Sequence, residues 1–143
     1  MKVKFKKLHP EATTPSYAKE GDAGLDITSI GYEYNHNMVA FIHSTGLAVE
    51  IPPGFVGLIF PRSSICKKDM ILSNHVGVID SSFRGEIKFI FKTLTDKLEA
   101  PIYTKGERIG QLIIMPYPKI ELEEVSELSE TERGSGGFGS TNK

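Results

Sequence analysis

Four arginines are the residues of this chain best suited to bind an anion, because each lies within two residues of glycine, proline or serine in a turn-forming context. They are Arg62, Arg84, Arg108 and Arg133, whereas the lysines are scattered along the sequence. The planar guanidinium group recognises phosphate through two parallel hydrogen bonds, which the point charge of a lysine cannot do. Any one arginine alone is most simply interpreted as a solvated surface charge. The local sequence contexts favour a functional role instead.

The first of these contexts is the sequence Pro61-Arg62-Ser63-Ser64, which follows an apolar segment. It is expected to end a strand and to open a short helix over residues 65–68, capped by Ser63 or Ser64. A guanidinium, two hydroxyls and the free N–H groups of a helix start would then lie together, which is an anion-binding arrangement. An ordinary serine N-cap explains the same four residues equally well.

Carboxylates adjoin turn residues in two further segments. Asp80 ends an apolar segment that begins at Gly77, and it either satisfies turn amides or acts as a base, since an aspartate is ionised at neutral pH. Asp22 and Asp26 flank Gly24, and hard oxygen ligands of this kind suit Mg²⁺, often through metal-bound waters.

Composition excludes several classes of protein. The chain has 17 basic and 18 acidic residues, so its net charge of -1 predicts neither nucleic acid nor an anionic membrane as a partner. Its single cysteine, Cys66, can form neither an intrachain disulfide nor a cysteine-rich zinc site. No apolar run approaches the roughly 20 residues that cross a bilayer, and the lysine-rich start lacks the apolar core of a signal peptide. We expect a cytoplasmic protein, or one of the host cytoplasm or nucleus if it is viral.

The elements that must position these residues are short strands separated by glycine and proline turns. Apolar runs and alternation predict six of them, at residues 2–6, 38–42, 47–51, 55–60, 87–94 and 109–115. A further segment, 77–85, is expected to be a strand that enters a tight turn. Helical periodicity is scarce, so we predict an all-β fold, a jelly-roll-like β-barrel in one domain.

The chain changes character near its end, which divides it into three segments. Residues 1–120 are expected to form the barrel domain. Residues 121–132 contain six glutamates and no basic residue, and we expect them to form an acidic arm. Residues 133–143 are rich in glycine and are expected to be a flexible lid. An extended arm of twelve residues spans up to about 40 Å, enough to reach a neighbouring subunit.

Taken in order, five segments resemble the motifs of the trimeric dUTPase family. These are residues 22–27, residues 61–64 with the following Lys67-Lys68, residues 74–86, residues 106–112 (Gly-Glu-Arg-Ile-Gly-Gln-Leu) and residues 133–141 (Arg-Gly-Ser-Gly-Gly-Phe-Gly-Ser-Thr). The resemblance implies a homotrimer with active sites at the subunit interfaces. It also implies that the protein hydrolyses dUTP to dUMP and pyrophosphate with Mg²⁺.

The resemblance also assigns roles to single residues. Asp80 would be the catalytic base that activates water, and Asp26 would hold Mg²⁺ through its waters. The substrate-binding residues would be Arg62, Ser63, Ser64 and Gln111 at the phosphates, Asn74, Gly77 and Val78 at the uracil, Phe83 under the deoxyribose, Arg133 at the γ-phosphate, and Phe138 over the uracil with Gly139 and Ser140 beside it.

Two departures from the family pattern accompany these assignments. Phe83 occupies a position that is usually tyrosine, which keeps the ring face and loses a hydroxyl. Lys67-Lys68-Asp69 is more polar than the usual continuation of the second motif.

Two alternative functions share the expected fold. The first is a dCTP deaminase, which needs a glutamate about ten residues after the aspartate; that position is Ile90 here, and Glu86 is out of phase. The second is a dUTPase-like trimer that serves as a regulatory protein-binding module. An unrelated β-sandwich whose loops match by chance is a third, non-functional explanation.

Overall fold

A computed structural model describes residues 1–95 and 101–137 of the chain, and almost all of its regular structure is β-strand. The strands are β1 Lys4–Lys7, β2 Leu25–Thr28, β3 Gly31–Asn35, β4 Ala40–Ser44, β5 Leu47–Glu50, β6 Phe55–Pro61, β7 Met70–Leu72, β8 Gly77–Ile79, β9 Lys88–Thr93 and β10 Arg108–Pro116. One 3₁₀ helix, η1 Ser63–Lys67, follows β6. Within residues 1–95 and 101–137, no helix is long and apolar enough to cross a membrane.

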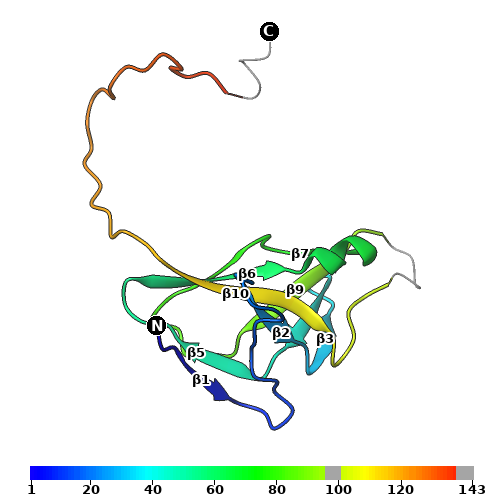
Figure 1. The fold of residues 1–143 in the computed structure, drawn as a ribbon. Helices are drawn as coiled ribbons and strands as arrows, with labels where there is room; N and C mark the ends of the chain where they lie inside the picture. The colour runs from blue at the N-terminus through cyan, green and yellow to red at the C-terminus, as the bar shows by residue number, and fades with distance from the viewer. Residues whose placement is uncertain (96–100, 138–143) are drawn as a thin grey trace.

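The strands form two four-stranded sheets and one two-stranded ribbon. The sheet orders are β2-β10-β6-β8 and β3-β4-β9-β7, β1 pairs with β5, and every pairing is antiparallel. Figure 1 shows the sheets folded around a common interior. This arrangement confirms the expected all-β, jelly-roll-like barrel.

Apolar side chains from both sheets and from the ribbon make up that interior. Its largest fully buried members are Tyr103, Phe89, Phe91, Ile27, Leu47, Ile51, Leu72, Ile87, Ile109 and Leu112. Because a buried aliphatic or aromatic side chain contributes about 1.5–3 kcal/mol, this cluster is the main source of the fold's stability. It also supplies the rigid support for the loops at the strand ends.

Six strands predicted from apolar runs are present, with ends displaced by up to two residues, and β8 is the strand expected at Gly77. Three short strands, β2, β3 and β7, were not predicted. β2 carries Asp26 in its interior, β3 has a mostly exposed and polar surface, and β7 has three residues. β2 and β3 lack an apolar run, and the apolar run of β7 is only three residues long.

The predicted serine-capped helix is wrong in its detail. The element is a 3₁₀ turn in which Ile65 N–H donates to the Arg62 carbonyl at 3.0 Å, and Lys68 N–H donates to the Ile65 carbonyl at 2.9 Å. Arg62 is its N-cap, no side chain caps it, and Ser63 and Ser64 lie inside the element. The serine hydroxyls are therefore not used to hold the helix start.

His43 is a buried polar residue in the core beside Tyr103. Its Nδ1 lies 3.1 Å from the Ser29 hydroxyl, and its ring packs against Tyr32 and Phe91. Among the residues described, nothing hydrogen-bonds its Nε2. Burial lowers the pKa of His43 to about 4, against a smaller opposing effect of the Glu107 charge. The imidazole is therefore neutral at physiological pH.

Beyond β10 the chain leaves the body of the protein. Tyr117 N–H still donates to the Gly54 carbonyl at 3.1 Å, and the following residues form an extended, exposed arm (Figure 1). At its far end, Gly134 N–H donates to the Thr131 carbonyl and Arg133 Nε donates to the Gly136 carbonyl, which makes a local turn. The division into domain, arm and lid at 120 and 132 stays a prediction.

Candidate active site

Asp26 lies between two arginines on the sheet β2-β10-β6-β8. Arg62 Nε donates to its Oδ1 at 3.0 Å, and an Arg108 terminal nitrogen donates to its Oδ2 at 2.8 Å. Arg62 follows the last residue of β6, and Arg108 begins β10, whose start lies opposite the end of β6. The Asp26 side chain is only 6% exposed, so these charged partners are what makes its burial tolerable.

This triad has a net positive charge and unused hydrogen-bonding capacity. Each ion pair uses one N–H of a guanidinium that has five. The carboxylate holds both guanidinium groups in place, while half of the Arg108 side chain stays exposed. The arrangement therefore presents oriented donors to an anion.

Gln111 lies directly opposite Asp26 in the β2–β10 pairing. A Cβ at Gly24 would come within 2.9 Å of the Gln111 Cβ and 3.1 Å of its Cδ. Glycine at position 24 therefore allows the Gln111 side chain to lie across the chain that precedes β2. This close approach fixes the amide beside the triad.

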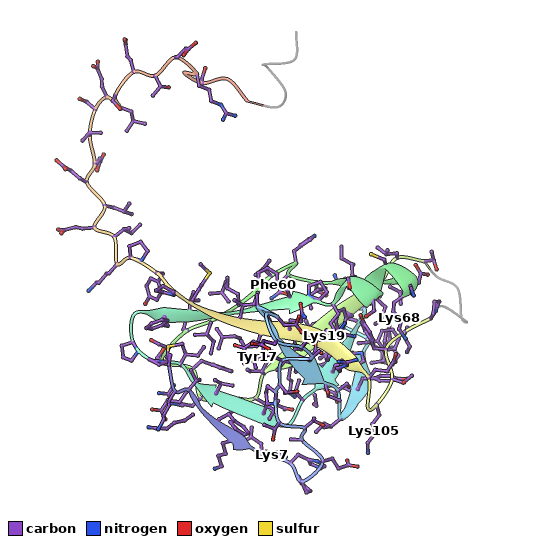
Figure 2. All side chains as sticks on the ribbon, in the orientation of Figure 1. Lys7, Tyr17, Lys19, Phe60, Lys68 and Lys105 are labelled. Atoms are coloured by element: carbon purple, nitrogen blue, oxygen red, sulfur yellow. The ribbon has the colours of Figure 1, made fainter. Side chains whose placement is uncertain are left out.

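A basic cavity of about 540 Å³ adjoins these residues. Its lining is Arg62, Ser64, Lys67, Lys68, Tyr103, Gly106, Glu107 and Arg108. The lining contains four cationic side chains and one carboxylate, so it favours a polyanionic ligand. Figure 2 shows Lys68 at this end of the molecule, where β10 begins.

The segment before Asp80 presents a free strand edge. β8 is the last strand of its sheet and pairs through Gly77 with Ile59 and through Val78 with Leu58 of β6. Asn74 is exposed in the turn that leads into β8, and Val78 is 64% exposed. Unpaired N–H and C=O groups along such an edge can hydrogen-bond a planar ligand.

Asp80 follows β8 directly, and its carboxylate is exposed. Its backbone carbonyl, not its side chain, accepts the turn's hydrogen bond from Phe83 N–H at 3.1 Å. Arg84 ties the same turn by donating to the carbonyls of Ser81 and Phe83 at 2.7 and 2.8 Å. Within the described part of the chain nothing hydrogen-bonds the Asp80 carboxylate, so the hypothesis that it satisfies turn amides fails.

The far end of the Phe83 ring lies close to the backbone of Gly85. A Cβ at Gly85 would come within 2.6 Å of the ring, so only glycine permits this position. Phe83 is 41% exposed, so part of its side chain is open to a ligand.

Asp80 and the basic cavity belong to two separate hollows of one chain. Asp80 lines a cavity of about 480 Å³ with Phe55, Val56, Val78, Ser81, Ser82 and Tyr117. This lining shares no residue with the basic cavity. The structure thus brings together Asp26, Arg62 and Gln111, and Ser64 lies in the basic cavity with Arg62. Within one subunit, Asp80 does not line the cavity that contains Arg62 and Ser64.

The chain is similar to known proteins along almost its whole length. A family model described as dUTPase matches residues 10–142. A deoxyuridine 5'-triphosphate nucleotidohydrolase of Hydrogenobaculum sp. is 43% identical over 143 residues, which is 99% of this chain and 98% of that protein. The enzyme of the same name from Nautilia profundicola is 44% identical over the full length of both.

The chain belongs to the dUTPase family.

Solved structures of this family agree with the fold. The Staphylococcus bacteriophage 80alpha dUTPase with dUpNHpp superposes with a TM-score of 0.77 at 30% identity, covering 97% of each chain. A variant of the same phage enzyme with dUpNHpp gives 0.78 at 29% identity, covering 98% of each chain. Trimers are typical of the family, and its members hydrolyse dUTP.

The dUTPase family works with a divalent metal, and the donor set here fits an indirect contact. Within residues 1–95 and 101–137, no three histidine, cysteine or acidic side chains cluster to hold a metal ion. Asp26 has about four lone-pair sites, of which the two arginines use two. Because Mg²⁺ keeps several waters and binds substrate phosphates, the remaining sites suit hydrogen bonds from metal-bound waters.

The other predicted site residues lie as follows. Ser63 is exposed in η1, and Arg133 is exposed and lines neither hollow. Phe138, Gly139 and Ser140 lie outside the described residues.

Two residues of the site were missed in the sequence. Arg108 is one of the four arginines near turn residues, which indicates anion binding, but no feature of the sequence pairs it with Asp26. Tyr103 lines the basic cavity and had no signal at all, because it reads as one more apolar residue before a turn.

Proposed function

We propose that this member of the dUTPase family, a dUTP diphosphatase, works as a homotrimer in which Asp80 of one subunit activates water against a triphosphate bound by another. Family membership supports the substrate class. The observation that carries the mechanism is the exposed Asp80 carboxylate at the end of an edge strand, in a hollow separate from the cationic one, with no hydrogen-bond partner among the described residues.

Asp80 is the base in this mechanism. Its carboxylate accepts a proton from water, and the water oxygen forms a bond to the α-phosphorus. The bond between the α-phosphorus and the oxygen that bridges to the β-phosphorus breaks. The products are dUMP and pyrophosphate. A positioned general base contributes about 10²–10⁴-fold to such a rate.

Selection of the nucleoside is assigned to the β8 edge and the turn after it. Asn74 and the backbone of Gly77 and Val78 hydrogen-bond the uracil edge, and tight packing leaves no room for the methyl group of thymine. Phe83 supports the deoxyribose with its free face, where a ribose hydroxyl would clash. The close contact of the Phe83 ring with Gly85, which holds the ring at this turn, supports this assignment.

The triphosphate occupies the basic cavity beside the Asp26 triad. Arg62, Ser63, Ser64 and Gln111 donate to its oxygens, and Asp26 would hold Mg²⁺ through metal-bound waters. The metal supplies charge neutralisation on the phosphate oxygens when bound. Oriented donors in a fixed site need no reorganisation when charge develops.

The last residues of the chain complete the site. Arg133 pairs with the γ-phosphate, and Phe138, with Gly139 and Ser140, closes over the uracil as a lid that excludes water. In the cell this reaction limits uracil incorporation into DNA and supplies dUMP for thymidylate synthesis. A cytoplasmic location, or the host-cell cytoplasm or nucleus for a viral protein, fits that role.

The geometry does not favour the deaminase alternative. Glu86 accepts hydrogen bonds from Thr45 N–H and Gly46 N–H at 3.1 and 2.8 Å, so its carboxylate holds the loop before β5. Ile90 lies within β9, opposite Ile42 of β4. Neither position offers a free carboxylate that could act on a cytosine ring.

The decisive test measures pyrophosphate release from dUTP, dTTP, dCTP and UTP, each with and without Mg²⁺. We expect release from dUTP alone, with strong dependence on the metal. Ammonia release from dCTP would instead establish a deaminase. Binding of dUTP without pyrophosphate release would establish a binding module.

A further inference from the structure

The hydroxyl of Tyr103 lies 3.4 Å from the Ser64 hydroxyl, inside the basic cavity that both residues line. We infer that Tyr103 is a positioning residue, which orients the Ser64 hydroxyl so that it donates its proton to a phosphate oxygen. The inference rests on the proposed function, because Ser64 is there a phosphate ligand. Tyr103 itself does not touch the substrate.

Tyr103 is held firmly enough to do this. It is only 1% exposed, and its ring centroid lies 5.3 Å from that of Phe91. Its backbone N–H donates to the Met70 sulfur at 3.3 Å. Since close-packed core side chains keep one rotamer, the phenol oxygen has a fixed place at the cavity wall.

Lys68 and Glu107 clamp the same residue from the cavity side. The Lys68 ammonium lies 5.0 Å from the Tyr103 ring centroid and donates to the Ile102 carbonyl and the Glu107 carboxylate, each at 2.9 Å. Glu107 also accepts a hydrogen bond from the Thr104 hydroxyl at 3.0 Å. Lys68 thereby joins the end of η1 to the loop that carries Tyr103, so Ser64 and Tyr103 keep their relative position.

The direction of the hydrogen bond follows from the ligand. Phosphate oxygens only accept, and a serine hydroxyl has one proton to donate. When the Tyr103 hydroxyl donates to Ser64 Oγ, the Ser64 proton is left for the phosphate. The distance of 3.4 Å is long for such a bond, and it shortens as the phosphate draws the Ser64 proton away.

The test replaces the hydroxyl alone, with Tyr103→Phe. Binding of dUpNHpp is measured directly, and binding of deoxyuridine, which has no phosphate, is measured as inhibition of dUTP hydrolysis. We expect dUpNHpp to bind about 3–10-fold more weakly, as expected for one lost hydrogen bond, while deoxyuridine binds within about 2-fold of the parent. The control is Tyr34→Phe, which removes an exposed phenol hydroxyl on β3 and should change neither.

A double-mutant cycle isolates the route through Ser64. In a Ser64→Ala background, Tyr103→Phe should cause no further loss of dUpNHpp affinity. Additive losses, equal weakening of deoxyuridine, or unchanged dUpNHpp binding would each overturn the inference. A Tyr103→Phe chain that fails to fold would also overturn it, because the hydroxyl would then serve stability.

The proposed function is tested separately on the unaltered protein. If that protein does not release pyrophosphate from dUTP, the proposed function fails. If it does and Tyr103→Phe behaves as the parent, only the role of Tyr103 fails.

Discussion

Asp26 and Gln111 face each other across the β2–β10 pair, and Gly24 leaves the space in which the Gln111 side chain lies. The same carboxylate holds Arg62 and Arg108 by one oxygen each. One short strand therefore aligns an amide and two guanidinium groups.

Replacing Asp26 by Asn should disorganise the cationic hollow. Both guanidinium groups lose their charged partner, so the free energy of unfolding should fall. We expect a fall of about 1–2 kcal/mol, because the arginines are partly exposed and solvent screens their ion pairs. Turnover of dUTP should fall at least 100-fold. Urea unfolding and pyrophosphate release measure the two effects. Glu33→Gln, which neutralises an exposed carboxylate on β3, is the control and should stay near the parent in both.

Replacing Asp80 by Asn should abolish turnover and leave nucleotide binding largely intact. The amide keeps the shape of the side chain but is no base, so we expect kcat to fall by about 10²–10⁴-fold. Affinity for dUpNHpp should change little. Near-normal kcat in this variant would remove Asp80 from its assigned role.

Deleting residues 133–143 should give a folded trimer with severely reduced activity. Residues 133–137 follow the extended arm and belong neither to a strand nor to the core, so the thermal midpoint should not change. Turnover should fall because the γ-phosphate loses Arg133 and the uracil loses its cover. Size-exclusion chromatography with light scattering checks the assembly. Parent-like rates would exclude a lid.

Stability should depend on pH through His43. Its pKa is lowered to about 4 in the folded protein, against about 6.5 in an unfolded chain. Between these values the unfolded state binds the extra proton, so the free energy of unfolding is highest above pH 6.5 and falls as the pH drops toward 4. The loss reaches at most about 3 kcal/mol.

Urea titrations at pH 7.5, 6, 5 and 4 measure this slope. His43→Val should flatten it, because a β-branched apolar residue in β4 does not titrate. His36→Asn, a substitution of an exposed histidine, should leave it as in the parent. A slope that survives His43→Val would assign the pH dependence to other groups.

The barrel could be predicted because its longer strands carry apolar runs between turn residues, as in Phe55–Pro61 and Arg108–Pro116. β2 escaped prediction because Asp26 interrupts its apolar pattern. The ion pairs that permit its burial come from residues 36 and 82 positions away. Periodicity within a window contains no information about such distant partners.

The site was predicted where a residue type and its turn context coincide, as for Arg62 and Asp80. It was not predicted where tertiary packing gives an ordinary residue its role. Tyr103 reaches Ser64 across 39 positions of sequence, and the expected serine cap fails because the turn closes through backbone groups. The contact between Tyr103 and Ser64 forms only in the folded chain. The turn at Arg62 closes through backbone hydrogen bonds, which side-chain types do not reveal.

The separation of Asp80 and Arg62 into two hollows has a genetic consequence in a trimer. A subunit with Asp80→Asn retains its own Arg62, and a subunit with Arg62→Ala retains its own Asp80. A trimer of either variant alone contains only defective active sites. A mixed trimer contains interfaces at which the intact Asp80 of one subunit meets the intact Arg62 of another. Two inactive alleles expressed together would therefore complement one another.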